Sequence, residues 1–180
     1  MVLHAFIGFD EHNPTDIGVE RFAGLAQYAN NLGVRIAFEN TEGEEYLETV
    51  MNALHGYASV GFCWDTGHEM CYNHSQNMMA LYGDRLFGTH LNDNLGIRDF
   101  NGEIDWHDDL HLLPYDGIAD WNKIGRRLVS FNGPLTFELN RCNKPNRLDN
   151  QKYIDMDFKD YIALAYARAC RVAAACTTSV

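Results

Sequence analysis

The sequence predicts an α/β fold with a parallel sheet at its centre. Short apolar runs alternate with longer amphipathic stretches, and this strand–helix pattern occurs five times over the 180 residues. The apolar runs are continuous, as in strands buried on both faces, and right-handed crossovers would join such strands into a parallel sheet. The length suits one core, so we expect a single domain over residues 1–180 with about five βα units.

Five apolar runs are the predicted strands. Polar residues or turn signals follow each of them, and the first run has the pattern of the end of a strand. The predicted strands cover Met1–His4, Val34–Phe38, Ser59–Trp64, Leu86–Thr89 and Leu135–Phe137.

The stretches between the strands predict helices, because apolar residues recur there at spacings that give a helix one buried face. Thr15 or Asp16 can cap the first helix, and Asp120 can cap the fourth. The predicted helices cover residues 16–31, 47–54, 75–82, 121–128 and 158–169. Between Asp93 and Ile118 the sequence has no clear period, and a loop of this length inside a compact domain is usually functional.

The composition argues against nucleic acid and membranes as partners. The chain has 14 basic and 25 acidic residues and a formal charge of −11, which repels phosphate backbones. No apolar stretch reaches the ~18 residues of a membrane span, and the N-terminus lacks the basic and apolar regions of a leader peptide. The five cysteines form no C-x-x-C pair, so we expect them to be reduced. The resulting expectation is a cytoplasmic protein.

Acidic and imidazole side chains directly follow four of the predicted strands. They are Glu39, Asp65, His90 and Glu138. Because parallel strands end at the same edge of a sheet, these side chains can converge on one point. Three carboxylates and one imidazole suit a divalent ion such as Mn²⁺, Mg²⁺ or Co²⁺. A single carboxylate after a strand is more often a helix cap or a solvated loop residue, but neither role requires the repetition at four strand ends.

Short motifs around these residues occur in a specific order along the whole chain. They are I-A-F-E-N at 36–40, D-T-G-H at 65–68, H-L-N-D at 90–93, the run His111…Pro114…Gly117…Asp120-Trp121, and L-T-F-E at 135–138. In this order they closely resemble the xylose-isomerase-like TIM barrel superfamily, which contains sugar phosphate isomerases and epimerases and the family 2 apurinic (AP) endonucleases. The family's barrel has eight strands, so the resemblance implies a partial TIM (β/α) barrel, the C-terminal portion, beginning at about the fourth strand.

The resemblance also implies a metal site and its ligands. The implied ligands of the divalent ion are Glu39, Asp65, His90 and Glu138, and Zn²⁺ joins the candidate ions. A second metal site is implied at His68, Asp109 and His111, because Asp109 and His111 match the D-x-H pair that the endonucleases use for an additional ion. His4 falls where a ligand of the multi-metal members would stand.

Three substrate contacts are implied in the same way. His68 would lie beside the substrate, Glu45 resembles a substrate-contacting acid of the ketose epimerases, and Arg98 would meet a substrate oxygen. Glu45 also has an alternative role, because an acid in the first turn of a helix interacts favourably with the helix dipole.

The implied activity is a divalent-metal-dependent isomerase or epimerase that acts on a sugar or sugar phosphate. Glu39 or Glu138 would remove the proton beside the carbonyl to give an enediolate, and the opposite glutamate would return a proton. Two alternatives stay open. One is a metal-dependent nuclease like the AP endonucleases, which Asp109 and His111 favour, and the other is a truncated, non-catalytic member of the superfamily.

The resemblance predicts a partner as well. A barrel without its first three βα units leaves two open edges and an uncovered flank of the core, which a soluble protein must cover. We therefore expect a homo-oligomer or a complementing chain across this gap. A truncated reading frame is the alternative.

Overall fold

The computed structural model describes residues 1–9, 13–98 and 103–177. Four parallel strands form one sheet in the order β1-β2-β3-β4. They are β1 (Val2–His4), β2 (Ile36–Glu39), β3 (Val60–Asp65) and β4 (Leu86–His90). Each agrees closely with a predicted strand.

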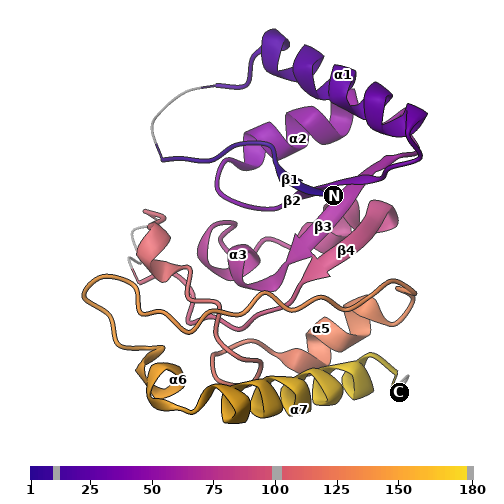
Figure 1. The fold of residues 1–180 in the computed structure, drawn as a ribbon. Coiled ribbons are helices and arrows are strands. Elements are labelled where there is room, and N and C mark those ends of the chain that lie inside the picture. The colour runs from indigo at the N-terminus through magenta and orange to yellow at the C-terminus, as the bar shows by residue number, and fades with distance from the viewer. Residues whose placement is uncertain (10–12, 99–102, 178–180) are drawn as a thin grey trace.

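Seven α-helices surround this sheet within the described residues. They are α1 (Asp16–Asn31), α2 (Glu44–Ala53), α3 (Thr66–Cys71), α4 (Met78–Tyr82), α5 (Trp121–Leu128), α6 (Gln151–Asp155) and α7 (Phe158–Thr177). In Figure 1, α1 and α2 lie near β1 and β2, and α5 and α7 lie together at the opposite end of the molecule. The short helices α3 and α6 are absent from the sequence prediction. None of the described helices combines the length and the apolar character that crossing a bilayer requires.

Side chains of β2 and β3 alternate between two faces. Phe38, Phe62 and Trp64 belong to the buried hydrophobic core, together with apolar residues of α2. Glu39 follows Phe38 and Asp65 follows Trp64, so these two side chains point to the opposite face, which is the interior of a barrel. The alternation places apolar packing outside the sheet and polar groups inside it.

The predicted fifth strand is reduced to a single bridge. Leu91 forms an isolated parallel bridge with Phe137, and the Leu91 N–H donates a 2.8 Å hydrogen bond to the Thr136 carbonyl. The Thr136 N–H in turn donates to Thr89 Oγ1 at 3.0 Å. Residues 135–137 thus lie beside the end of β4, as predicted. The sheet does not close within the described residues, and the prediction of an α/β, partial TIM barrel is confirmed.

A buried carboxylate organises the long loop after β4. Asp93 accepts hydrogen bonds from the Tyr115 N–H at 2.9 Å, the Ala119 N–H at 3.0 Å and Trp121 Nε1 at 2.8 Å. An antiparallel bridge also joins Asp93 to Leu112. The loop is therefore folded back over the strand ends, and it carries His111 to that edge of the sheet.

Candidate metal and substrate site

Four side chains at neighbouring strand ends converge on one point, and we call them the first cluster. Glu39 ends β2, Asp65 ends β3, His90 ends β4, and Glu138 follows the bridge beside β4. One ligand atom from each lies within 4.8 Å of the others. Asp65 and His90 are in register across β3 and β4, which explains why the two side chains meet.

His90 lies between the two glutamates. Its Nδ1 is 3.0 Å from Glu39 Oε2 and 3.0 Å from Glu138 Oε2. On the other side, His4 Nε2 from β1 lies 3.3 Å from Glu39 Oε2. The Glu39 side chain is buried, whereas that of Glu138 is 48% exposed. The cluster is therefore accessible to solvent on the Glu138 side.

Three polar groups orient Asp65. Its Oδ1 accepts a 2.7 Å hydrogen bond from the His68 N–H, and its Oδ2 accepts a 2.8 Å hydrogen bond from Asn92 Nδ2. The Asn40 amide donates to the Asp65 carbonyl and accepts from the Asp65 N–H. A Cβ at Gly67 would lie 1.9 Å from Asn92 Oδ1, so glycine is needed there for the close approach of Asn92. The Asp65 carboxylate is held in one orientation as a result.

Burial and neighbouring charges shift the pKa values in this cluster. Burial opposes ionisation of Glu39, but contacts with three imidazoles outweigh it and lower the pKa of this carboxyl. Burial also opposes protonation of His90, but the Glu138 and Glu39 carboxylates outweigh it and raise the pKa of His90 to about 10. Burial raises the pKa of Asp65 to about 6. The carboxylates thus attract positive charge, which protons on the imidazoles supply here.

The donor set fits a divalent metal ion. Glu39 Oε1 and His90 Nδ1 are buried, and neither has a hydrogen bond of good geometry among the described residues. Three carboxylates and one imidazole suit Mn²⁺, Mg²⁺ or Co²⁺, which prefer oxygen ligands. The four residues predicted as ligands therefore lie together with the right donor atoms to hold one ion.

A second cluster, made of His68, Asp109 and His111, adjoins the first. His68 Nε2 lies 3.5 Å from Asp109 Oδ1, and His111 Nε2 lies 2.8 Å from the same oxygen. One ligand atom from each of the three lies within 4.8 Å of the others. His68 links the two clusters, because its Nδ1 is 3.3 Å from Glu39 Oε1.

Backbone carbonyls fix the orientation of both imidazoles in the second cluster. His68 Nδ1 donates to the Asn40 carbonyl at 2.9 Å, and His111 Nδ1 donates to the Glu138 carbonyl at 3.1 Å. Because a carbonyl oxygen only accepts, Nδ1 carries the hydrogen and Nε2 faces Asp109 in both residues. Burial opposes protonation of His111, but Asp109 outweighs it and raises the pKa of His111 to about 9.

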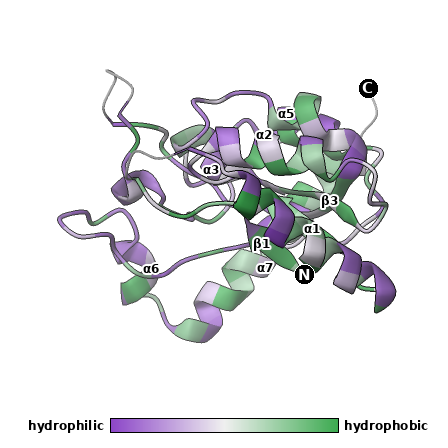
Figure 2. Cartoon of the chain, turned by 90° about the horizontal axis from the view of Figure 1, so that it is seen from above, coloured by the Kyte–Doolittle hydropathy of each residue, from purple (hydrophilic) through white to green (hydrophobic). Residues whose placement is uncertain are grey.

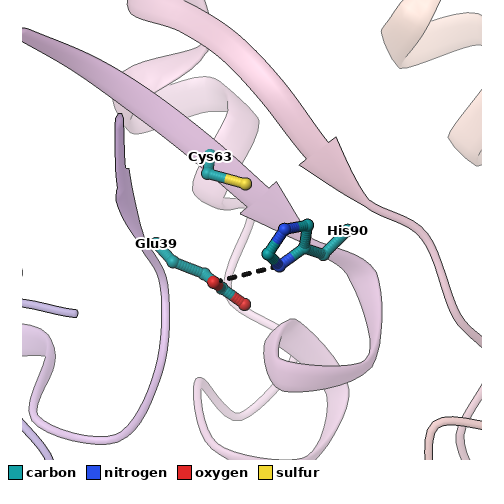
Figure 3. A group of neighbouring side chains, drawn as sticks. All are labelled: Glu39, Cys63 and His90. Carbon is teal, nitrogen blue, oxygen red and sulfur yellow. Dashed lines mark ion pairs between the residues drawn. The ribbon is translucent and has the colours of Figure 1, made fainter. Parts of the chain in front are cut away.

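Cys63 adjoins the first cluster. It stands two residues before Asp65, so its side chain lies on the same face of β3. Figure 3 shows the thiol pointing toward the Glu39–His90 ion pair, and the ligand atoms of these three residues lie within 4.8 Å of one another. Burial raises the pKa of the thiol, which is therefore neutral at pH 7. The period of two along the strand could have identified Cys63 from the sequence.

Lys144 is a further residue of the site that the sequence did not indicate. It lies in the loop between Glu138 and α6, and its Nζ is 3.4 Å from Asp109 Oδ2. Its side chain is only 15% exposed, and Nζ lies 5.2 Å from the centre of the Trp106 ring. A single lysine in a loop has no periodic signal, so no pattern in the sequence points to it.

Two of the predicted substrate contacts belong to neither cluster. Glu45 is exposed in the first turn of α2, the position that its alternative role describes. Arg98 Nε donates to Asp108 Oδ1 at 2.7 Å, and Arg98 Nη2 donates to Asp105 Oδ2 at 3.2 Å. Arg98 therefore cross-links the loop after β4.

Known proteins match most of the chain. The profile of the xylose isomerase-like TIM barrel family matches residues 6–156. An uncharacterized protein from Sinorhizobium fredii is 35% identical over an alignment of 113 positions, which covers 58% of this chain and 33% of that protein. The chain thus spans about a third of the length of this curated relative.

Solved structures share the fold. A D-tagatose 3-epimerase-like protein has a TM-score of 0.54 and 17% identity over 93% of this chain and 63% of its own. The 3-keto-D-glucoside 4-epimerase from E. coli has a TM-score of 0.56 and 14% identity over 92% of this chain and 63% of its own. At these identities the likeness shows the fold alone. Because the family profile matches residues 6–156, which make up most of the chain and include both clusters, the chain belongs to the xylose isomerase-like TIM barrel family.

Proposed function

We infer that this site isomerises or epimerises a sugar or sugar phosphate with one divalent ion bound at the first cluster. The observation that supports this most strongly is the convergence of three carboxylates and one imidazole within 4.8 Å at neighbouring strand ends. Two proteins of similar fold are described as an epimerase and an epimerase-like protein, which favours sugar chemistry within the family.

Glu39 and Glu138 are the candidate acid–base pair. Glu39 enters the site from β2 and Glu138 from the segment beyond β4, so the two carboxylates approach from different sides. One carboxylate would remove the proton from the hydroxyl-bearing carbon beside the carbonyl, which gives an enediolate. The other would return a proton to the opposite face of the same carbon, which gives the epimer. When bound, a divalent ion supplies Lewis-acid stabilisation of the negative charge on the sugar oxygens.

Isomerisation differs from epimerisation only in the steps that follow the enediolate. A proton delivered to the former carbonyl carbon, while a hydroxyl proton passes to the former carbonyl oxygen, exchanges the positions of the two groups. The half-exposed Glu138 faces the solvent side and can exchange its proton with water. Both reactions therefore predict uptake of solvent hydrogen at carbon.

Solvent exchange in D₂O tests this proposal. With added Mn²⁺, we expect the chain to place deuterium on the carbon beside the carbonyl of at least one ketose or ketose phosphate, as measured by NMR. A chelator should abolish the exchange. Glu39→Gln and Glu138→Gln should each slow it by about 100-fold or more, because each removes an acid–base group.

The matched control is Glu48→Gln, which removes an exposed carboxylate on α2 and should keep the wild-type rate. Failure to detect exchange with any sugar of the panel and any divalent ion would overturn the proposal. That result would support the alternative of a non-catalytic member of the superfamily.

The second cluster favours a second candidate, a metal-dependent nuclease acting on abasic DNA. His68, Asp109 and His111 offer three donor atoms for an additional ion. The formal charge of −11 opposes binding of a phosphate backbone. We expect no cleavage of a duplex containing an abasic site in the presence of Zn²⁺, and efficient cleavage would favour the nuclease.

A further inference from the structure

Lys144 places a fixed positive charge against the second cluster. Asp109 is the one carboxylate of that cluster, and its Oδ1 faces His68 and His111. Its Oδ2 lies 3.4 Å from Lys144 Nζ. Asp109 Oδ2 is therefore paired with an ammonium, whereas Oδ1 lies near two imidazoles without a hydrogen bond of good geometry among the described residues.

The lysine is held in place. Its side chain is 15% exposed and that of Asp109 is 14% exposed, so water screens this ion pair only partly. The face of Trp106 lies 5.2 Å from the ammonium, a distance at which an aromatic ring attracts a cation. Lys144 is thus confined between an acid and a ring, whereas the side chain of Lys123, in an ion pair with Asp120, is 73% exposed.

The two clusters differ in their fixed charges. The first cluster has three carboxylates, and within the described residues no lysine or arginine forms an ion pair with Glu39, Asp65 or Glu138. The second cluster has one carboxylate, whose charge the Lys144 ammonium already balances. A dication at the first cluster is therefore attracted by three negative charges, and one at the second would be repelled by an ammonium at close range.

We propose that Lys144 takes the electrostatic place of a second metal ion, so that the site binds one divalent ion only. The ion is held by the first cluster, and the side chains of His68, Asp109 and His111 are left to form hydrogen bonds with hydroxyl groups of the sugar. This inference rests on the proposed function, because it requires an ion at the first cluster. It also disfavours chemistry that needs additional ions, as the nuclease alternative does.

Counting bound ions tests the inference without any measurement of activity. The whole chain is titrated with Mn²⁺, and the free ion is followed by electron paramagnetic resonance. Mn²⁺ is chosen because this hard ion binds poorly to the free cysteines, of which Cys142 and Cys170 are exposed. The wild-type chain should saturate at one ion.

Three variants separate the charge of Lys144 from its bulk. Lys144→Met keeps most of the side-chain volume without the charge. This variant should bind a second ion, with an affinity at the second cluster on the order of tenfold or more above that of the wild-type chain. Lys144→Arg keeps the charge and should bind one ion. Lys123→Met, which removes an exposed lysine of α5, should also bind one ion.

Several results would overturn the inference. Two or more ions in the wild-type chain would do so even if Lys144→Met failed to fold, and so would a single ion in a folded Lys144→Met. Circular dichroism reports the folding of each variant, and Lys144→Gln replaces the methionine variant if needed. If neither the wild-type chain nor any variant binds an ion, the result contradicts the proposed function together with this inference.

Discussion

At the scale of single residues, buried asparagines hold the candidate metal ligand Asp65 in place. Asn92 donates to Asp65 Oδ2 at 2.8 Å, while its own backbone N–H is bonded to Thr66 Oγ1 at 3.0 Å. Asn40 donates to both the Asp65 carbonyl and Asn73 Oδ1 at 2.9 Å. Groups that orient a ligand in this way contribute to metal affinity without touching the ion.

Replacement of Asn92 by alanine should weaken metal binding. The variant leaves Asp65 Oδ2 without its hydrogen bond and lets the carboxylate rotate, so we expect the affinity for Mn²⁺ to fall about 10- to 100-fold. A Mn²⁺ titration of folded protein measures this. Asn122→Ala, at an exposed position of α5, is the control and should keep the wild-type affinity. An unchanged affinity in Asn92→Ala would contradict the role of Asn92 in orienting Asp65 for an ion.

Strand ends were the part of the site that the sequence could predict. Glu39, Asp65, His90 and Glu138 each follow an apolar run, and parallel strands bring such positions to one edge. Their role as metal ligands stays a prediction. Lys144 could not be found in this way, because its contact with Asp109 depends on how two loops fold against each other.

A single glutamate joins several elements behind the site. Glu69 of α3 is buried, and its Oε2 accepts from Trp64 Nε1 of β3 at 2.9 Å and from the Met78 N–H of α4 at 3.1 Å. Arg127 of α5 donates to both of its carboxylate oxygens at 2.7 Å and lies 4.1 Å over the Trp64 ring. The helix α3 therefore connects the strand end to α4 and α5.

Replacement of Arg127 by methionine should destabilise the chain. The variant leaves the buried Glu69 carboxylate without its paired donor and removes the cation above Trp64, so we expect the free energy of unfolding to fall by about 2 kcal/mol. Urea denaturation followed by circular dichroism measures this. Arg126→Met, at the exposed neighbouring position, should change the stability little. Equal stabilities of the two variants would contradict this account of the α3–α5 contact.

The short helices are the elements that the apolar pattern of the sequence could not predict. Helix α3 spans Thr66–Cys71, which is too short to display an apolar period, and it begins because Asp65 caps it by accepting the His68 N–H. The predicted helix 75–82 begins later, at Met78, because His74 and Ser75 have positive φ values of 50° and 58° and form a turn. The long helix α1 spans the predicted residues, because its apolar period extends over several turns. Helix α7 begins at the predicted Phe158 but continues to Thr177, beyond the predicted end at residue 169.

At the scale of the whole molecule, the edge of one strand is unpaired and an apolar face of one helix is exposed. Within the described residues β1 pairs with β2 alone, so its other edge has unpaired backbone groups. Helix α7 carries exposed apolar side chains at Phe158 (60%), Ile162 (49%) and Tyr166 (72%), which lie four residues apart on one face. Figure 2 shows hydrophobic segments of α7 next to hydrophilic ones. A soluble protein usually covers such a face with a partner.

We predict that the chain associates with itself through this surface. Light scattering over a range of concentrations should give a mass above the 20.5 kDa of one chain. The double variant Ile162→Glu and Tyr166→Glu places two charges on the apolar face of α7 and should shift the population to the monomer, because burying an unpaired charge costs more than the interface gains. Asp160→Lys changes a charge at an exposed position of the same helix outside that face and should leave the association intact. A monomer at every concentration would contradict self-association and would leave a separate complementing chain as the way to cover the open sheet.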